Sequence, residues 1–237
     1  MPTRPSATCG IMLSIMITGL FLTTAKAAET MDLNIVTIEK ATPPETLILK
    51  QPAHTVNFPL SEADHTLIKK MEAKLYALHG VGLAATQIGV AKKIAVVYIP
   101  EEAALLRENA CIKPMHVLIN PEYWPVGTTT KETDYEGCYS VATISGKVPR
   151  FHTIRVKYQT KKGEFIDTVV SGFYARVLQH EIDHLNGILI TDRLTPDCLQ
   201  GDHASMLKAR RQELPEEKRH YLDTWAKQKG INVQEAE

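Results

Sequence analysis

The sequence is short of cysteine and carries no net charge. Its four cysteines, Cys9, Cys111, Cys138 and Cys198, are too few and too scattered for a disulfide-stapled scaffold. Lys and Arg together number 27, as do Asp and Glu, so the formal net charge is zero. Nucleic-acid-binding domains are typically basic, and this composition therefore gives no indication of a nucleic-acid partner. The sequence also contains no internal repeat and no low-complexity segment.

Long hydrophobic runs are absent apart from one near the N-terminus, at residues 10–22. A transmembrane helix needs about 20 apolar residues, so this run is short for one. Arg4 precedes the run, and Ala25-Lys26-Ala27 has the small-x-small form of a cleavage site. The pattern predicts a signal peptide over residues 1–27, with export to the periplasm or outside the cell and no stable membrane span after cleavage. An uncleaved anchor, or a wrongly assigned start codon with a cytoplasmic protein, stays open as an alternative.

The remaining residues have the pattern of one domain with both helices and strands. With 237 residues, of which 44% are apolar, the chain is long enough for a sizeable core. An amphipathic helix is expected within residues 58–80, with Ser61 as its N-cap and Gly80 as its stop. Buried strands are expected at 93–100 and 116–121, and a polar excursion with some helix at 101–114.

The second half combines a hairpin with a longer helix. Residues 153–160 and 164–172 alternate in polarity around Lys161-Lys162-Gly163, which predicts a β-hairpin. A helix is expected at 173–186, ended by Gly187, and one or two surface helices between residues 196 and 229. Because most strands precede the main helix, an α+β fold is favoured over regular β-α-β alternation.

The main predicted helix contains the segment QHEIDHLNG, residues 179–187. His180 and His184 are four residues apart, so on a helix both imidazoles lie on one face and can bind one ion. Glu181 completes the H-E-x-x-H pattern of zinc hydrolases, in which the glutamate is the general base. A solvated helix face with two histidines gives the same spacing, so this motif alone leaves both interpretations open.

A catalytic metal site needs a third protein ligand and an open position for water. In metzincin proteases a further histidine follows, but here that position is Ile190. Glu213 has a suitable distance along the chain but lies in a charged run typical of a solvated face. Cys138, within YEGCYS, is the better candidate, because Gly137 lets the backbone pass close to a bound group. An isolated cysteine is more often a small buried hydrophobe.

Three segments together resemble the peptide deformylase family. They are GVGLAATQ at residues 80–87, EGCYS at 136–140 and QHEIDHLNG at 179–187, in the order that the family has them. LINP at 118–121 and VPR at 148–150 are also similar to family segments, and the resemblance spans about residues 46–221. One departure is Tyr139, where many members carry Leu. If the backbone N–H at this position is what matters, the side chain need not be Leu.

The resemblance implies a fold, a set of boundaries and an activity. The fold would be α+β, with mixed and antiparallel strands packed around a central helix that carries H-E-x-x-H. The boundaries would be a leader at 28–45, a catalytic domain at 46–222 and a C-terminal tail at 223–237. The activity would be metal-dependent hydrolysis of the N-formyl group of N-formylmethionyl peptides, with release of formate. No prediction of an oligomeric state follows from the sequence.

The resemblance also implies residue roles. Cys138, His180 and His184 would hold one divalent ion per chain, Fe(II) in the native enzyme, with zinc, nickel or cobalt able to substitute. Glu181 would move protons, and Gln87 and the Tyr139 backbone N–H would stabilise the oxyanion. Arg150 and Asp183 would not bind the ion but would hold the residues around it, with Arg150 orienting Glu136. The substrate would contact six further residues: Gly80, Val81, Gly82, Glu136, Gly137 and Val177.

Two other functions remain alternatives at the level of sequence. A general metalloprotease would cleave internal peptide bonds and use a third ligand other than Cys138. A non-catalytic relative would bind formyl peptides without turning them over, although every catalytic residue type is present. An exported enzyme would also expose its cysteines to oxidation, and Cys111 and Cys198 would remain as a candidate disulfide pair after removal of the signal.

Overall fold

The computed structural model describes residues 33–107, 110–127 and 130–231. The signal peptide expected at 1–27 lies outside the described residues, as do the first residues of the leader and the end of the tail. Helix α1 (Pro43–Lys50) spans the expected boundary at 45/46, and α6 (Glu216–Gln228) spans the one at 222/223. The domain boundaries therefore stay a prediction.

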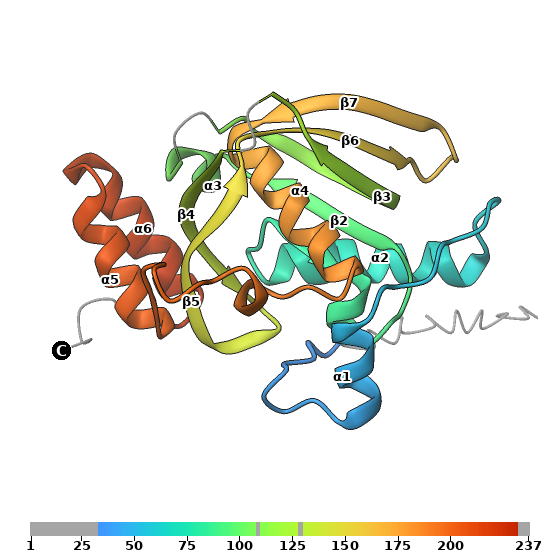
Figure 1. Ribbon diagram of the computed structural model, residues 1–237, viewed down its shortest axis with the longest axis horizontal. Coiled ribbons are helices and arrows are strands. Elements are labelled where there is room, and N and C mark those ends of the chain that lie inside the picture. Colours follow the sequence, from blue (N-terminus) through green and yellow to red (C-terminus); the bar gives the residue numbers. More distant parts are fainter. Residues whose placement is uncertain (1–32, 108–109, 128–129, 232–237) are drawn as a thin grey trace, which may run out of the picture. The chain divides into compact units, whose positions relative to one another are not determined.

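Two sheets contain all eight strands in the described part of the chain (Figure 1). The larger sheet has the order β1-β2-β3-β6-β7, and every neighbouring pair is antiparallel. Its strands are β1 (Gly82–Ala84), β2 (Ile94–Ile99), β3 (Lys113–Pro125), β6 (Thr153–Gln159) and β7 (Phe165–Ser171). The smaller antiparallel sheet consists of β4 (Lys131–Cys138), β5 (Val141–Phe151) and β8 (Gln200–Gly201). The mixture of helices with antiparallel sheets confirms the α+β prediction.

Helix α2 (Glu62–Ala77) forms where its sequence predicts it. Ser61 is the N-cap: its hydroxyl oxygen accepts from the Asp64 N–H at 3.1 Å, and the Asp64 carboxylate accepts from the Ser61 N–H at 3.2 Å. Ile68, Met71 and Leu75 follow at helical spacing and are buried against the larger sheet. The helix ends at Ala77, before the Gly80 expected as its stop, because His79 already has the left-handed φ of 48°.

Helix α4 (Gly172–Leu185) contains the H-E-x-x-H motif and contacts both sheets. Its apolar side packs Ala175, Leu178 and Ile182 against β2, β3 and β6 of the larger sheet. Figure 1 shows α4 between that sheet and the β4–β5 hairpin. Gly187 ends the helix with φ of 75°, as predicted, and lies so close to the Lys50 backbone that a Cβ would be 2.5 Å from it.

The other elements differ in part from the expectations. Helix α3 (Glu101–Leu105), the β6–β7 hairpin and two C-terminal helices, α5 (His203–Glu213) and α6, are present as predicted. Helix α1, the β4–β5 hairpin, and the 3-10 turns η1 (Ala85–Ile88) and η2 (Ile190–Asp192) were not predicted. Helices α5 and α6 also differ from simple surface helices, because α5 packs on β4 and β5, and α6 packs on α3.

Two further predictions concern membranes and thiols. Across the described residues, no helix combines the length and the apolar character needed to span a bilayer. Cys111, Cys138 and Cys198 are all free thiols, and of these Cys138 is buried. Cys111 and Cys198 are therefore not bonded to each other in this structure.

Candidate metal centre

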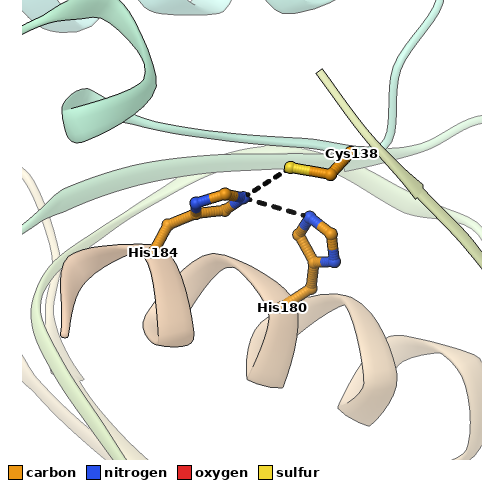
Figure 2. A group of neighbouring side chains, drawn as sticks. All are labelled: Cys138, His180 and His184. Atoms are coloured by element: carbon orange, nitrogen blue, oxygen red, sulfur yellow. Dashed lines mark hydrogen bonds between the residues drawn. The ribbon is translucent and has the colours of Figure 1, made fainter. Parts of the chain in front are cut away.

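Cys138, His180 and His184 meet in one buried cluster (Figure 2). The Sγ atom of Cys138 lies 3.1 Å from Nε2 of His184, and that nitrogen lies 3.2 Å from Nε2 of His180. Cys138 comes from the end of β4, and the two histidines come from successive turns of α4. The hairpin and the helix thus bring together residues that are 46 positions apart in the chain.

The three donor atoms fit one ion. They all lie within 4.8 Å of one another. Nitrogen and thiolate ligands bound to a tetrahedral ion at about 2.0–2.3 Å are themselves roughly 3.3–3.7 Å apart, so small adjustments suffice. Burial, with His180 and Arg150 nearby, holds the pKa of His184 well below its ordinary value. A lowered pKa favours the neutral imidazole, which is the form that binds a metal.

Glu181 lies beside this cluster and is 4% exposed. Its carboxylate oxygen Oε2 is buried with no hydrogen-bond partner among the described residues, so it is free to accept a proton. Burial, opposed by His180 and Arg150 and reinforced by Glu136, raises the pKa of Glu181 to about 7. Gly82 makes the room for this side chain, because a Cβ at that position would clash with the carboxylate.

Glu136 holds the imidazole ring of His180 through its Nδ1 atom. Its Oε2 lies 3.0 Å from Nδ1 of His180, so the carboxylate fixes the ring and directs Nε2 to the cluster. The expected bidentate contact is present: Arg150 donates from Nε and Nη2 to the two carboxylate oxygens, at 3.0 and 2.9 Å. Arg176 donates to the same carboxylate at 2.7 Å. Burial raises the pKa of Glu136, but Arg150 and His180 outweigh it and hold that pKa well below the ordinary value.

Asp183 bridges two arginines, Arg150 and Arg193. It pairs with Arg150 and also accepts from Arg193 at 2.7 and 3.0 Å. The Tyr123 hydroxyl donates to it at 3.3 Å. Asp183 therefore supports the cluster through Arg150, which in turn holds Glu136.

Gln87 and Tyr139 both lie next to Cys138. The Gln87 side chain is fixed at one end, where its Oε1 accepts from the Ala84 N–H at 2.9 Å. Its Nε2 lies 3.8 Å from the Cys138 sulfur, so this amide donates toward the cluster. Tyr139 follows Cys138 directly, and its hydroxyl donates to the Leu78 carbonyl at 3.2 Å.

A cavity of about 650 Å³ opens onto the cluster. All six residues assigned to substrate line it, and so do Gln87, Cys138, His180 and Glu181. The other two protease ligand positions supply no ligand. Ile190 is apolar and packs in the same buried cluster as Cys138. Glu213 accepts hydrogen bonds from the Tyr135 hydroxyl and from Lys147. Cys138 is thus the third group that accompanies the two histidines.

Sequence reasoning missed part of this cavity wall. Arg176 contacts Glu136, and it could have been found from its place one turn before His180 on the predicted helix. Arg210 and Lys229 line the cavity from the C-terminal region of the chain. No local pattern in the sequence indicates that these two residues would lie there.

Proteins of known family resemble this chain in sequence. The polypeptide deformylase family model matches residues 33–199. Peptide deformylase 2 of Rickettsia conorii is 40% identical over 168 residues, which cover 69% of this chain and 81% of that protein. Peptide deformylase 1 of Nitrosomonas europaea is 42% identical over 147 residues, covering 62% of this chain and 81% of that one.

Solved structures give the same result. A class I type b peptide deformylase from Acinetobacter baumannii with Met-Ala-Ser bound superposes with a TM-score of 0.59 at 32% identity, covering 70% of this chain and 99% of that one. A Synechococcus elongatus peptide deformylase in complex with actinonin gives 0.57 at 30% identity, covering 85% and 90%. The chain belongs to the polypeptide deformylase family.

Proposed function

We propose that this protein is a metal-dependent hydrolase that removes the N-formyl group from N-formylmethionyl peptides and releases formate. The observation that carries the proposal is the convergence of Cys138, His180 and His184 beside the buried carboxylate of Glu181, at the base of a cavity. Family membership supports the activity, and the peptide bound to the Acinetobacter relative supports a peptide substrate. The finer view of the fold, with strands packed around α4 as a central helix, is part of the proposal.

Each residue has a role in this scheme. Cys138, His180 and His184 would hold one divalent ion, which would supply Lewis-acid chemistry and lower the pKa of a bound water toward about 7. Glu181 accepts the proton of the attacking water and later delivers it to the departing amine. The Gln87 amide and the Tyr139 backbone N–H donate to the oxyanion that forms on the formyl oxygen.

Other residues position the substrate and the ligands. The backbone from Gly80 to Gly82 pairs with an extended peptide, and Val81 and Val177 contact its methionine side chain. Gly137 lets the peptide approach the end of β4. Glu136, held by Arg150 and through it by Asp183, keeps His180 in the ligating orientation.

The activity has a direct test. Replacement of Glu181 by Gln removes the proton acceptor but none of the ligands, so formate release from formyl-Met-Ala-Ser should fall about 10²–10⁴-fold. Metal content, measured by mass spectrometry, should stay near one ion per chain. Cys138→Ser is the contrasting variant and should lose both. Unchanged turnover in Glu181→Gln would refute the proposed role.

The identity of the ion is a separate proposal. We infer Fe(II), with zinc, nickel or cobalt as substitutes, because the family resemblance implies it; affinity alone favours zinc over iron. Anaerobic purification followed by metal analysis and activity measurement tests this. Loss of activity on exposure to air, restored by Fe(II), supports iron, whereas an air-stable zinc protein with full activity contradicts it.

Export is also proposed, on the N-terminal pattern of Arg4, the apolar run at 10–22 and the small residues up to Ala27. The intact mass of the native protein from fractionated cells decides it. A chain that begins at Ala28 in an extracytoplasmic fraction supports an enzyme that acts on exported formyl peptides. A cytoplasmic chain with another start returns the enzyme to nascent chains.

A further inference from the structure

The two C-terminal helices form one wall of the cavity above the metal centre. The family model ends at residue 199, whereas this wall begins at residue 203. Figure 1 shows α5 and α6 beside the β4–β5 hairpin, which bears Cys138. Their contributions to the lining include Met206, Leu207, Arg210, Trp225 and Lys229.

The charges in this cavity are unbalanced. Two of the lysine and arginine side chains that line it are neutralised by carboxylates: Arg107 pairs with Asp134, and Arg176 pairs with Glu136. The other two, Arg210 and Lys229, make no ion pair within the part of the chain that the structure describes. Glu136 is already shared among Arg150, Arg176 and His180, so among the described residues Arg210 and Lys229 remain without a paired carboxylate and can contact an anionic ligand.

Arg210 is 8% exposed, and its one hydrogen bond in the described structure runs from Nη2 to the Leu106 carbonyl at 2.9 Å. A guanidinium has five N–H donors, so most of them are left without a partner. Burial and the nearby Arg107 lower the pKa of Arg210 to about 9, against the opposing effect of the Asp134 carboxylate. An anion in the cavity would offset the penalty of burying this charge.

Lys229 is held over two aromatic rings. Its Nζ donates to the Tyr139 hydroxyl at 2.7 Å and lies 4.6 Å from the Tyr139 ring centroid and 4.7 Å from that of Trp225. Burial lowers the pKa of this ammonium to about 8. The rings fix the cation in place but do not neutralise it, and two of its N–H donors remain free for a ligand.

We propose that Arg210 and Lys229 select formyl peptides that carry a carboxylate. This inference rests on the proposed function and adds a substrate class to it. The carboxylate comes either from an acidic side chain after the formylmethionine or from the free C-terminus of a short peptide. Both sources present the same planar anion, which guanidinium and ammonium groups bind.

Formate release from three peptides tests the proposal and separates the sources. They are formyl-Met-Ala-Ser, its C-terminal amide, and formyl-Met-Ala-Asp amide. A hydrogen-bonded charge contact predicts about tenfold higher kcat/KM for at least one carboxylate peptide than for the neutral amide. Preference for the first assigns the C-terminal carboxylate, and preference for the third assigns the acidic side chain.

Variants then distinguish selection from a structural role. Lys229→Gln and Arg210→Gln should each reduce the ratio of acidic to neutral kcat/KM, while Lys229→Arg retains it. Lys227→Gln changes an exposed lysine of α6 outside the cavity and should leave the ratio unchanged. A purely structural Lys229 would lower both rates equally. An equal rate for all three peptides, or a ratio unchanged in both variants, would overturn the inference.

A binding measurement separates this inference from the proposed reaction. The chain has two tryptophans, so Trp124→Phe leaves Trp225 of the cavity as the fluorescent reporter. Met-Ala-Ser, Met-Ala-Ser amide and Met-Ala-Asp amide are then titrated into this variant. At least one carboxylate peptide should bind about tenfold more tightly than the amide, and Lys229→Gln should remove the difference. If no formyl peptide releases formate, the proposed function fails, while this titration still decides the carboxylate site.

Discussion

At the scale of single residues, Gly82 is a position where the backbone passes close to the Glu181 side chain. A methyl group there would occupy the space of the Glu181 carboxylate. Gly82→Ala should therefore displace Glu181 and lower kcat by about tenfold or more, with a smaller effect on folding. The test measures kcat for turnover, and the circular dichroism spectrum and melting temperature for folding. Gly201→Ala is the control, because its Cβ would meet no atom closer than 3.4 Å.

Asp183 carries a second prediction at this scale. It is 2% exposed and pairs with two arginines, so Asp183→Asn leaves the buried Arg150 with one carboxylate fewer. Breaking a buried pair typically costs about 3–5 kcal/mol of unfolding free energy. Urea denaturation measures this loss. Asp167→Asn, which breaks an exposed pair with Arg155, should change stability little, and an equal loss in both variants would contradict the argument.

At the scale of elements, the start of α2 predicts a pH dependence of stability. Burial raises the pKa of Asp64, but the contacts from Lys92 and Ser61 outweigh it, so the folded pKa lies below the ordinary value. The stabilisation is therefore present above that ordinary value and is lost as pH falls through the folded pKa. Asp64→Ala should cost about 1 kcal/mol at pH 7, and the difference from wild type should shrink in acid. Urea titrations at several pH values measure it, with the exposed Glu62→Ala as control.

Elements also differ in how well the sequence alone predicts them. Helices α2 and α4 both have apolar periodicity, α2 follows the N-cap Ser61, and α4 is followed by Gly187. The three ligands lie in short motifs. Strand β4, by contrast, reads Lys-Glu-Thr-Asp-Tyr-Glu-Gly-Cys, with little apolar alternation, and forms because β5 pairs with it. Helix α1 begins with two prolines that suggest a leader, yet proline is tolerated at the start of a helix.

The cavity lining was predictable only in part, because some of its residues come from segments far from the motifs in the sequence. Gly80, Gly82, Glu136 and Val177 lie within or beside the motifs, so their presence in the lining was expected. Arg210 and Lys229 reach it through the packing of α5 and α6, which depends on contacts between segments far apart in the chain. Local periodicity carries no information about such contacts.

At the scale of the whole molecule, the metal centre joins the β4–β5 hairpin to α4. An ion that binds the folded chain but not the unfolded one stabilises it by mass action, by about 4 kcal/mol at a thousand times its dissociation constant. Removing the ion with a chelator should therefore lower the melting temperature, and adding it back should restore it. Glu181→Gln keeps all three ligands and should show the same shift. Cys138→Ser should show much less, and an equal shift in this variant would place the stabilising ion elsewhere.

An ion bound by both Cys138 and His184 would join segments that are 46 residues apart in the chain. Ion binding should therefore also affect how long a molecule resists proteolysis. Chains without the ion should open more often, and proteases cut an open form in proportion to its population. The molecules that lack catalytic competence are thus the ones degraded first. Metal supply would then set the abundance of this protein as well as its turnover, and the surviving pool would be enriched in working enzyme.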